Sequence, residues 1–140
     1  MANIDAAQAN IDEKSDRRIL VADDDPAILR LVATILEKEN YAVVTARDGR
    51  EAYKVLQSDS NFIAAILDVV MPHISGPELV RYMKTEKNLM RVPVMIMTAE
   101  QDPKLSSDSF AAGAVVFLPK PFTTAQLQIM LQMLIGKLPS

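Results

Sequence analysis

Short apolar runs recur along the chain, and each is followed by a longer segment with apolar residues at helical spacing. The runs occupy residues 19–22, 41–45, 64–67, 94–97 and 114–118. Most of them show no polar alternation, which is typical of parallel strands that are covered on both faces. The regular succession of strand and helix predicts a series of βα units and therefore a parallel sheet.

Capping signals mark where the helices should begin, because certain side chains accept hydrogen bonds from the first free amides of a helix. These signals are Asp25–Pro26, Ser75 with Glu78, Asp102–Pro103, and Thr123 with Gln126, and Asp48–Gly49 makes the turn into the second helix. The last helix is expected to end at Gly136. We therefore predict an α/β fold with a doubly wound, five-stranded parallel sheet, strand order 2-1-3-4-5, and helices on both faces.

Polar residues follow four of the predicted strands. They are Asp23, Asp24 and Asp25 after the first, Asp68 after the third, Thr98 after the fourth and Lys120 after the fifth. Right-handed crossovers bring the carboxyl ends of parallel strands to one edge of the sheet, so these residues should converge there. Asp68 alone would be equally compatible with a residue that merely ends a strand and opens a loop.

Neighbouring carboxylates repel one another unless a cation joins them, and an all-oxygen site with few protein ligands favours Mg²⁺. Asp24 and Asp68 are the expected direct ligands, and Asp23 acts either through a bound water or as a second ligand. Asp25 is better explained as a helix cap.

The expected charges suit phosphoryl transfer. Asp23, Asp24 and Asp68 carry three negative charges, which Mg²⁺ and Lys120 balance. A carboxylate in such a site can attack phosphorus to form an aspartyl phosphate, while the Thr98 hydroxyl donates to a phosphoryl oxygen.

Composition narrows the setting. The chain has 140 residues, of which 49% are hydrophobic and 24% charged, so one globular domain is expected over residues 17–138, after a flexible tail at 1–16. The net charge of −3 and the absence of a basic stripe argue against direct nucleic-acid binding. No apolar run is long enough for a membrane span, and the chain has no cysteine. A cytoplasmic setting is therefore expected.

Four stretches together resemble the receiver domain of two-component response regulators. They are residues 19–26 (ILVADDDP), 67–72 (LDVVMP) with Gly76, 97–99 (MTA) and 118–122 (LPKPF). The resemblance implies a switch that accepts a phosphoryl group on Asp68 from a histidine kinase or histidine phosphotransfer protein and turns over no separate substrate. It implies Mg²⁺ held by Asp24, Asp68 and the Val70 carbonyl, a switch formed by Thr98 and Phe117, and a cis Lys120–Pro121 bond.

Three positions depart from the family pattern or invite a second explanation. Phe117 stands where a tyrosine is frequent, so an output step that needs its hydroxyl is in doubt. Val70 cannot orient an attacking water, which predicts slow dephosphorylation unless Glu100 does so. His73, the single histidine, is expected to be an exposed loop residue and not a phosphotransfer residue.

Two other protein classes fit part of the pattern. A flavodoxin-like electron carrier shares the predicted fold, but the acidic residues after the first strand would repel a flavin phosphate. A Mg²⁺-dependent phosphohydrolase with an aspartate nucleophile shares the chemistry, although 140 residues leave little room for a cap over a substrate pocket. Steady turnover of a small phosphoester would favour this second class.

The last predicted helix has no charged residue between positions 122 and 136. Leu127, Met130, Leu131, Leu134 and Leu138 form one apolar stripe that is explained as core. Ile129 and Met133 fall on the opposite side, where they are either isolated exposed residues or a contact surface for a downstream protein or a second copy of the chain.

Overall fold

A computed structural model of the chain describes residues 17–99, 107–108, 111–113 and 116–136. The strands are β1 (Arg18–Ala22), β2 (Ala42–Ala46), β3 (Ala64–Asp68), β4 (Val94–Thr98) and β5 (Val116–Pro119). The helices are α2 (Pro26–Lys38), α3 (Gly49–Ser58), α4 (Gly76–Thr85) and α6 (Thr124–Ile135). All strand pairs are parallel, and the strand order β2-β1-β3-β4-β5 confirms the prediction.

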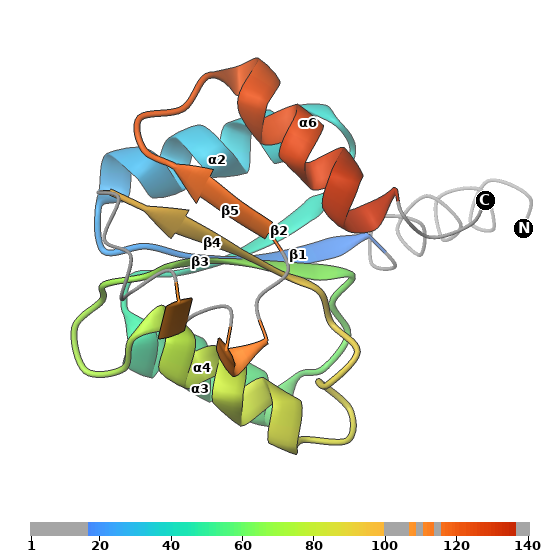
Figure 1. Cartoon of the computed structure of the whole chain (residues 1–140). Coiled ribbons are helices and arrows are strands. Elements are labelled where there is room, and N and C mark those ends of the chain that lie inside the picture. The colour runs from blue at the N-terminus through green and yellow to red at the C-terminus, as the bar shows by residue number, and fades with distance from the viewer. Residues whose placement is uncertain (1–16, 100–106, 109–110, 114–115, 137–140) are drawn as a thin grey trace, which may run out of the picture.

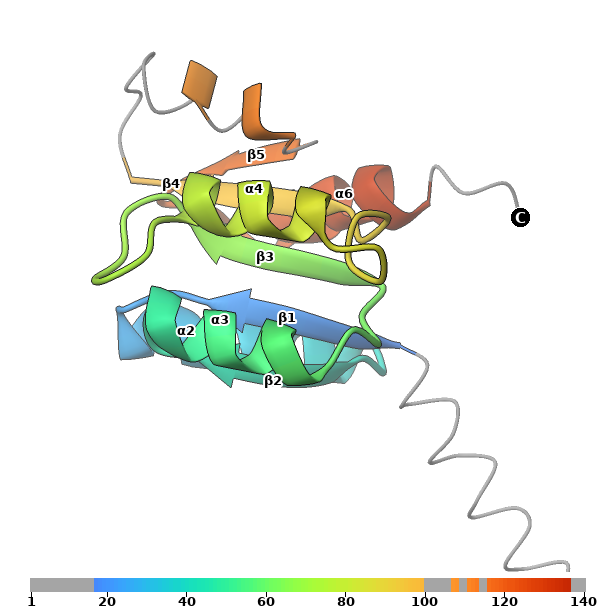
Figure 2. The same cartoon turned by 90° about the horizontal axis from the view of Figure 1, so that it is seen from below.

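The helices form two layers with the sheet between them. Helices α2 and α6 cover one face, and α3 and α4 cover the other (Figure 1; Figure 2 shows α3 and α4 from their own side). Successive strand residues alternate between two cores: Ile19 and Val21 pack with α2 and α6, whereas Leu20 and Ala22 pack with α3 and α4. This double coverage is why the strands contain almost no polar residues.

The strand register brings the ends of β1 and β3 together. Ala22, the last residue of β1, pairs with Leu67 of β3. Asp23 directly follows Ala22, and Asp68 directly follows Leu67 as the last residue of β3. These side chains therefore meet at the carboxyl edge of the sheet, where the direction of the chain connections reverses.

The predicted caps are present in the described helices. Asp25 accepts a hydrogen bond from the Ala27 amide at 2.9 Å and caps α2. Complete capping boxes open α4 and α6, through Ser75 with Glu78 and Thr123 with Gln126. Asp48, which was predicted only as part of a turn, also caps α3 by accepting from the Glu51 amide at 2.8 Å.

Some boundaries differ from the prediction. The helical pattern that follows Asp25–Pro26 in the sequence extends to residue 40, but α2 ends at Lys38, because Asn40 takes a left-handed conformation with φ 68° that closes the helix. The second strand begins at Ala42, one residue later than predicted, where the Ala42 amide first bonds to Arg17. The expected tail at 1–16, the helix start at Asp102–Pro103, residues 114–115, Glu100 and Leu138 lie outside the described residues.

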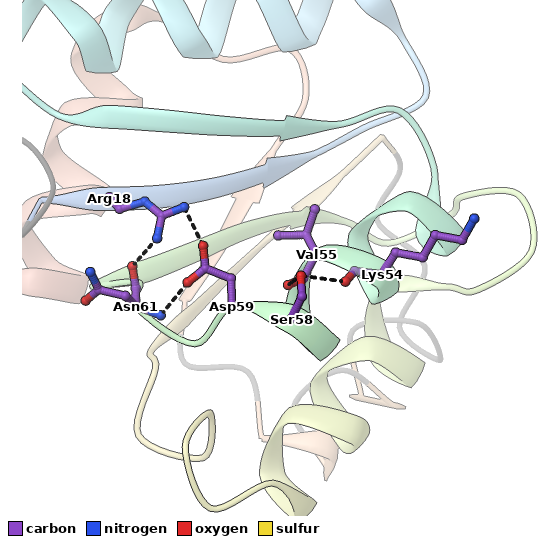
Figure 3. A network of polar contacts seen from close by, with 6 residues as sticks. All are labelled: Arg18, Lys54, Val55, Ser58, Asp59 and Asn61. Carbon is purple, nitrogen blue, oxygen red and sulfur yellow. Dashed lines mark hydrogen bonds and ion pairs between the residues drawn. The ribbon is translucent and has the colours of Figure 1, made fainter.

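A network of polar contacts lies at the start of β1 and the end of α3 (Figure 3). Arg18, at the start of β1, forms an ion pair with Asp59 at 2.6 Å and donates to the Asn61 carbonyl at 3.2 Å. Beside it, Ser58, the last residue of α3, donates to the Lys54 and Val55 carbonyls of the same helix. The hydrogen bond from Arg18 holds the pKa of the Asp59 carboxyl below its usual value. Arg18 thus links β1 to the connection between α3 and β3.

None of the helices in the described part of the chain combines the length and apolar composition needed to cross a bilayer.

Candidate metal and phosphoacceptor site

Three carboxylates converge at the carboxyl edge of the sheet, as the sequence predicts. One oxygen from each of Asp23, Asp24 and Asp68 lies within 4.8 Å of the other two. Asp23 and Asp68 are buried, whereas Asp24 is exposed. Three carboxylate oxygens at this spacing, with one side open to solvent, fit a hard cation that keeps several waters.

Asp23 already has protein partners on both of its oxygens. Its Oδ1 accepts from the Asp25 amide at 2.8 Å, and its Oδ2 accepts from the Lys120 ammonium at 2.7 Å. Its own amide donates to the Ala46 carbonyl of β2 at 3.1 Å. Asp23 is therefore rigidly placed, and this arrangement favours the alternative in which it reaches a cation through a water.

Lys120 lies between two of the carboxylates. Its ammonium nitrogen is 2.7 Å from Asp23 Oδ2 and 3.4 Å from Asp68 Oδ1. Its amide donates to the Thr98 carbonyl at 2.7 Å, and its bond to Pro121 is cis, as expected. Burial would lower the pKa of the ammonium group, but the hydrogen bond to Asp23 and the charge of Asp68 outweigh it and raise the pKa. Lys120 is therefore cationic.

The surroundings of the Asp68 carboxyl disfavour its ionised form. Burial, followed by the negative charge of Asp23, raises the pKa of Asp68 to about 6, although Lys120 acts in the opposite direction. Lys120 offsets only part of this rise in pKa, and it lies closer to Asp23 than to Asp68. Additional positive charge close to Asp68 would therefore stabilise its ionised form.

Thr98 and Phe117 lie on the strands next to Asp68. Thr98 ends β4 and is buried, and its neighbour Met97 pairs with Asp68. Phe117, on β5, is half-buried and packs against the core on the side of α3 and α4. The Val70 side chain is 63% exposed. Because it is a hydrocarbon, it offers no polar group to the site.

The structure also contains contacts that the motif analysis missed. The Gly49 amide, at the start of α3, donates to the Pro72 carbonyl at 3.2 Å. His73 is exposed, as expected, but its Nδ1 lies 3.2 Å from Arg50 Nη2. The sequence signal was the Asp48–Gly49 pair, which we interpreted only as a turn into a helix.

Sequence comparison places these motifs in a family. The family model of the response regulator receiver domain matches residues 19–132. This chain belongs to the response regulator receiver domain family. Receiver domains are signalling switches of two-component systems, and the fold and motifs described above are those of this family.

Similar proteins include complete response regulators. Response regulator MprA of Mycolicibacterium vanbaalenii is 36% identical over 110 residues, which cover 79% of this chain and 46% of MprA. Transcriptional regulatory protein ResD of Bacillus subtilis is 30% identical over 127 residues, which cover 91% of this chain and 51% of ResD. The receiver domain thus spans about half the length of these two relatives.

Solved structures agree on the fold. Chemotaxis protein CheY4 of Vibrio cholerae matches with a TM-score of 0.78 and 33% identity, over 84% of this chain and 97% of that one. The receiver domain of a sensor histidine kinase from Pseudomonas aeruginosa PAO1, solved with a magnesium ion coordinated in its active-site cleft, matches with a TM-score of 0.78 and 28% identity, over 86% of this chain and 98% of that one.

Proposed function

We propose that this receiver domain accepts a phosphoryl group on Asp68 from a phosphohistidine of a histidine kinase or histidine phosphotransfer protein, in a reaction that requires Mg²⁺. The observation that carries the proposal is the position of Asp68, buried at the end of β3 beside Lys120 and two further carboxylates. Such kinases take their phosphate from ATP, so the proposed setting is the cytoplasm.

The chemistry is a transfer between two nucleophiles. A carboxylate oxygen of Asp68 forms the new bond to phosphorus, while the bond from phosphorus to the imidazole nitrogen breaks and leaves its electron pair on that nitrogen, which takes up a proton. Lys120 then lies close enough to bond a phosphoryl oxygen, and the Thr98 hydroxyl can donate to another. Later hydrolysis by water restores the Asp68 carboxylate.

The carboxylates of Asp24 and Asp68 and the Val70 carbonyl are the proposed metal ligands, with Asp23 acting through a water. Their oxygens are the hard donors that Mg²⁺ prefers, and the P. aeruginosa relative holds magnesium in its active-site cleft. When bound, the ion supplies positive charge that offsets the charge of the phosphoryl oxygens. The raised pKa of Asp68 supports this need for a cation.

Thr98 and Phe117 are the proposed switch. Thr98 lies on the strand between β3 and β5, so a phosphoryl group that bonds its hydroxyl would draw the end of β4 toward Asp68. Phe117 is half-buried on the adjoining strand β5, and inward rotation of its ring is the proposed response to movement of Thr98. Because Phe117 lacks a hydroxyl, this step acts through packing alone.

The alternative of a phosphohydrolase is tested by stoichiometry. A receiver domain incubated with acetyl phosphate and Mg²⁺ should incorporate at most one phosphoryl group per chain. After that, it should consume acetyl phosphate no faster than its own aspartyl phosphate is hydrolysed. Continuous hydrolysis of small phosphoesters of varied structure would favour the phosphohydrolase.

Helix α6 offers the proposed output surface. Ile129 and Met133 are 59% and 53% exposed on a helix without a charged residue, beside an apolar groove formed with Leu118 and Pro121. Leu127, Leu131 and Leu134 occupy the opposite, buried side. We propose that phosphorylation promotes docking of a downstream protein or a second copy of the chain here, because α6 contacts β5, the strand that carries Phe117.

Light scattering tests the homodimer. With beryllofluoride, which mimics the phosphoryl group, the parent protein should dimerise, and Ile129→Glu should remain monomeric because it places a charge in the contact. Leu31→Glu is the matched control, since Leu31 is 43% exposed on α2 and its replacement should leave dimerisation intact. Normal dimerisation of Ile129→Glu would remove α6 from the interface, and a parent that stays monomeric would leave a downstream protein as the partner.

The lifetime of the aspartyl phosphate should depend on residue 70. Val70 is exposed near Asp68 and cannot hydrogen-bond an attacking water, so phosphate loss should be slow in the parent. Val70→Asn supplies a group that can orient this water, and we expect at least about tenfold faster loss. The measurement follows the decay of labelled protein after acetyl phosphate is removed; loss that is fast in the parent and unchanged in the variant would contradict the argument.

A further inference from the structure

We infer that the turn between β2 and α3 is a brace that positions the loop after Asp68 for Mg²⁺ binding, with Gly49 as its positioning residue. This inference rests on the proposed Mg²⁺ site. We use "β2–α3 turn" for residues 46–49 and "Asp68 loop" for residues 69–75, which contain the Val70 carbonyl.

The Asp68 loop is anchored at its base, and its outer bend is held separately. The Gly76 amide donates to the Val69 carbonyl at 3.0 Å, which joins the two ends of the loop. The Ile74 amide donates to the Pro72 carbonyl at 2.9 Å and tightens the outer bend. At the base, the Val69 amide also donates to the Met97 carbonyl of β4 at 3.0 Å, and the Val69 and Met71 side chains are buried in the core. The backbone of the outer bend at Pro72 is held by a different segment of the chain.

The β2–α3 turn holds the outer bend of the Asp68 loop from outside the loop. The Gly49 amide donates to the Pro72 carbonyl, the same carbonyl that bonds Ile74. The approach is so close that a Cβ at Gly49 would stand 1.8 Å from the Ile74 carbonyl oxygen, far below the 3.0 Å that real Cβ contacts keep. Only glycine allows the two backbones to meet here. The contact between Arg50 and His73 adds a side-chain link between the same two segments.

The same turn also holds the acidic side of the site. The Ala46 carbonyl accepts from the Asp23 amide at 3.1 Å, three residues before Gly49. The turn between these points is stiff, because Asp48 accepts from the Glu51 amide and Glu51 accepts in return from the Arg47 amide at 3.0 Å. One short segment therefore contacts both Asp23 and the Asp68 loop, in addition to the pairing of β1 with β3 that brings Asp23 and Asp68 together.

The test measures Mg²⁺ affinity by calorimetry, with Mg²⁺ alone and no phosphodonor. Gly49→Ala must displace the Asp68 loop, and we expect its Mg²⁺ affinity to fall about tenfold, the size of effect seen when groups that orient metal ligands are removed. Leu56→Ala is the matched control, because Leu56 is buried at the other end of α3 and its loss lowers the urea midpoint without touching the loop. It should keep the affinity of the parent.

The outcomes separate three cases. Parent affinity in Gly49→Ala, or an equal loss in Leu56→Ala, would overturn the brace. A parent protein that binds no Mg²⁺ would instead overturn the proposed function. If Gly49→Ala does not fold, amide hydrogen exchange on the parent decides, because a brace that favours Mg²⁺ binding must itself be strengthened by Mg²⁺. Exchange at Gly49 should slow more than at Ala52 of the same helix, and equal slowing at both amides would contradict the inference.

Discussion

Replacing Asp68 with asparagine is expected to abolish covalent phosphorylation by acetyl phosphate. Asparagine has nearly the same shape, so the fold should persist, but its neutral amide oxygen is a poor nucleophile and leaves Mg²⁺ one charged ligand short. Intact-mass spectrometry after incubation with acetyl phosphate and Mg²⁺ measures the outcome. The parent should gain one phosphoryl group, and the variant should gain none.

Asp25→Asn is the matched control for this experiment. Asp25 lies two residues from Asp23 but its side chain caps α2, a role that asparagine performs equally well. The control should therefore be labelled like the parent. Undiminished labelling of Asp68→Asn, or loss of labelling in Asp25→Asn alone, would show that Asp68 is not the phosphoacceptor.

The features that the sequence predicts well are those with local causes. Continuous apolar runs predicted all five strands, because a strand buried on both faces excludes polar residues wherever it lies. The capping boxes at Ser75 and Thr123 were predicted because their partners are three residues away. Topology then brought Asp23, Asp24 and Asp68 together without further information, since parallel strands end at one edge.

The features that were not predicted depend on contacts between distant segments. The closeness of Gly49 to Ile74 arises from two connections that flank β1 in space but are separated by 25 positions in the chain. The Lys120 ammonium nitrogen lies 2.7 Å from an oxygen of Asp23 but 3.4 Å from one of Asp68. The spacing of these residues along the sequence cannot predict such a difference. Burial and the charge of Asp23 raise the pKa of Asp68 despite the nearby Lys120, so the electrostatics of the site required the structure.

The raised pKa of Asp68 has a measurable effect on stability without Mg²⁺. In the unfolded chain the carboxyl titrates near 3.8, and in the folded chain near 6. As pH rises between these values the unfolded state loses this proton first, so the free energy of unfolding of the parent should fall, by a total of about 3 kcal/mol. Asp68→Asn carries no such charge. It should be more stable than the parent by about this amount above pH 7, with the gap closing below pH 4.

Urea unfolding from pH 4 to pH 8, in the presence of a chelator, measures this gap, and Asp59→Asn provides a control of opposite sign. Because Arg18 lowers the pKa of Asp59, that carboxylate stabilises the fold at neutral pH, and its replacement should destabilise the protein there but not at low pH. Adding Mg²⁺ should stabilise the parent more than Asp68→Asn and narrow their gap, because the ion binds the folded parent more tightly. An Asp68→Asn variant no more stable than the parent at pH 7.5 without Mg²⁺ would mean that Asp68 meets no net repulsion in this site.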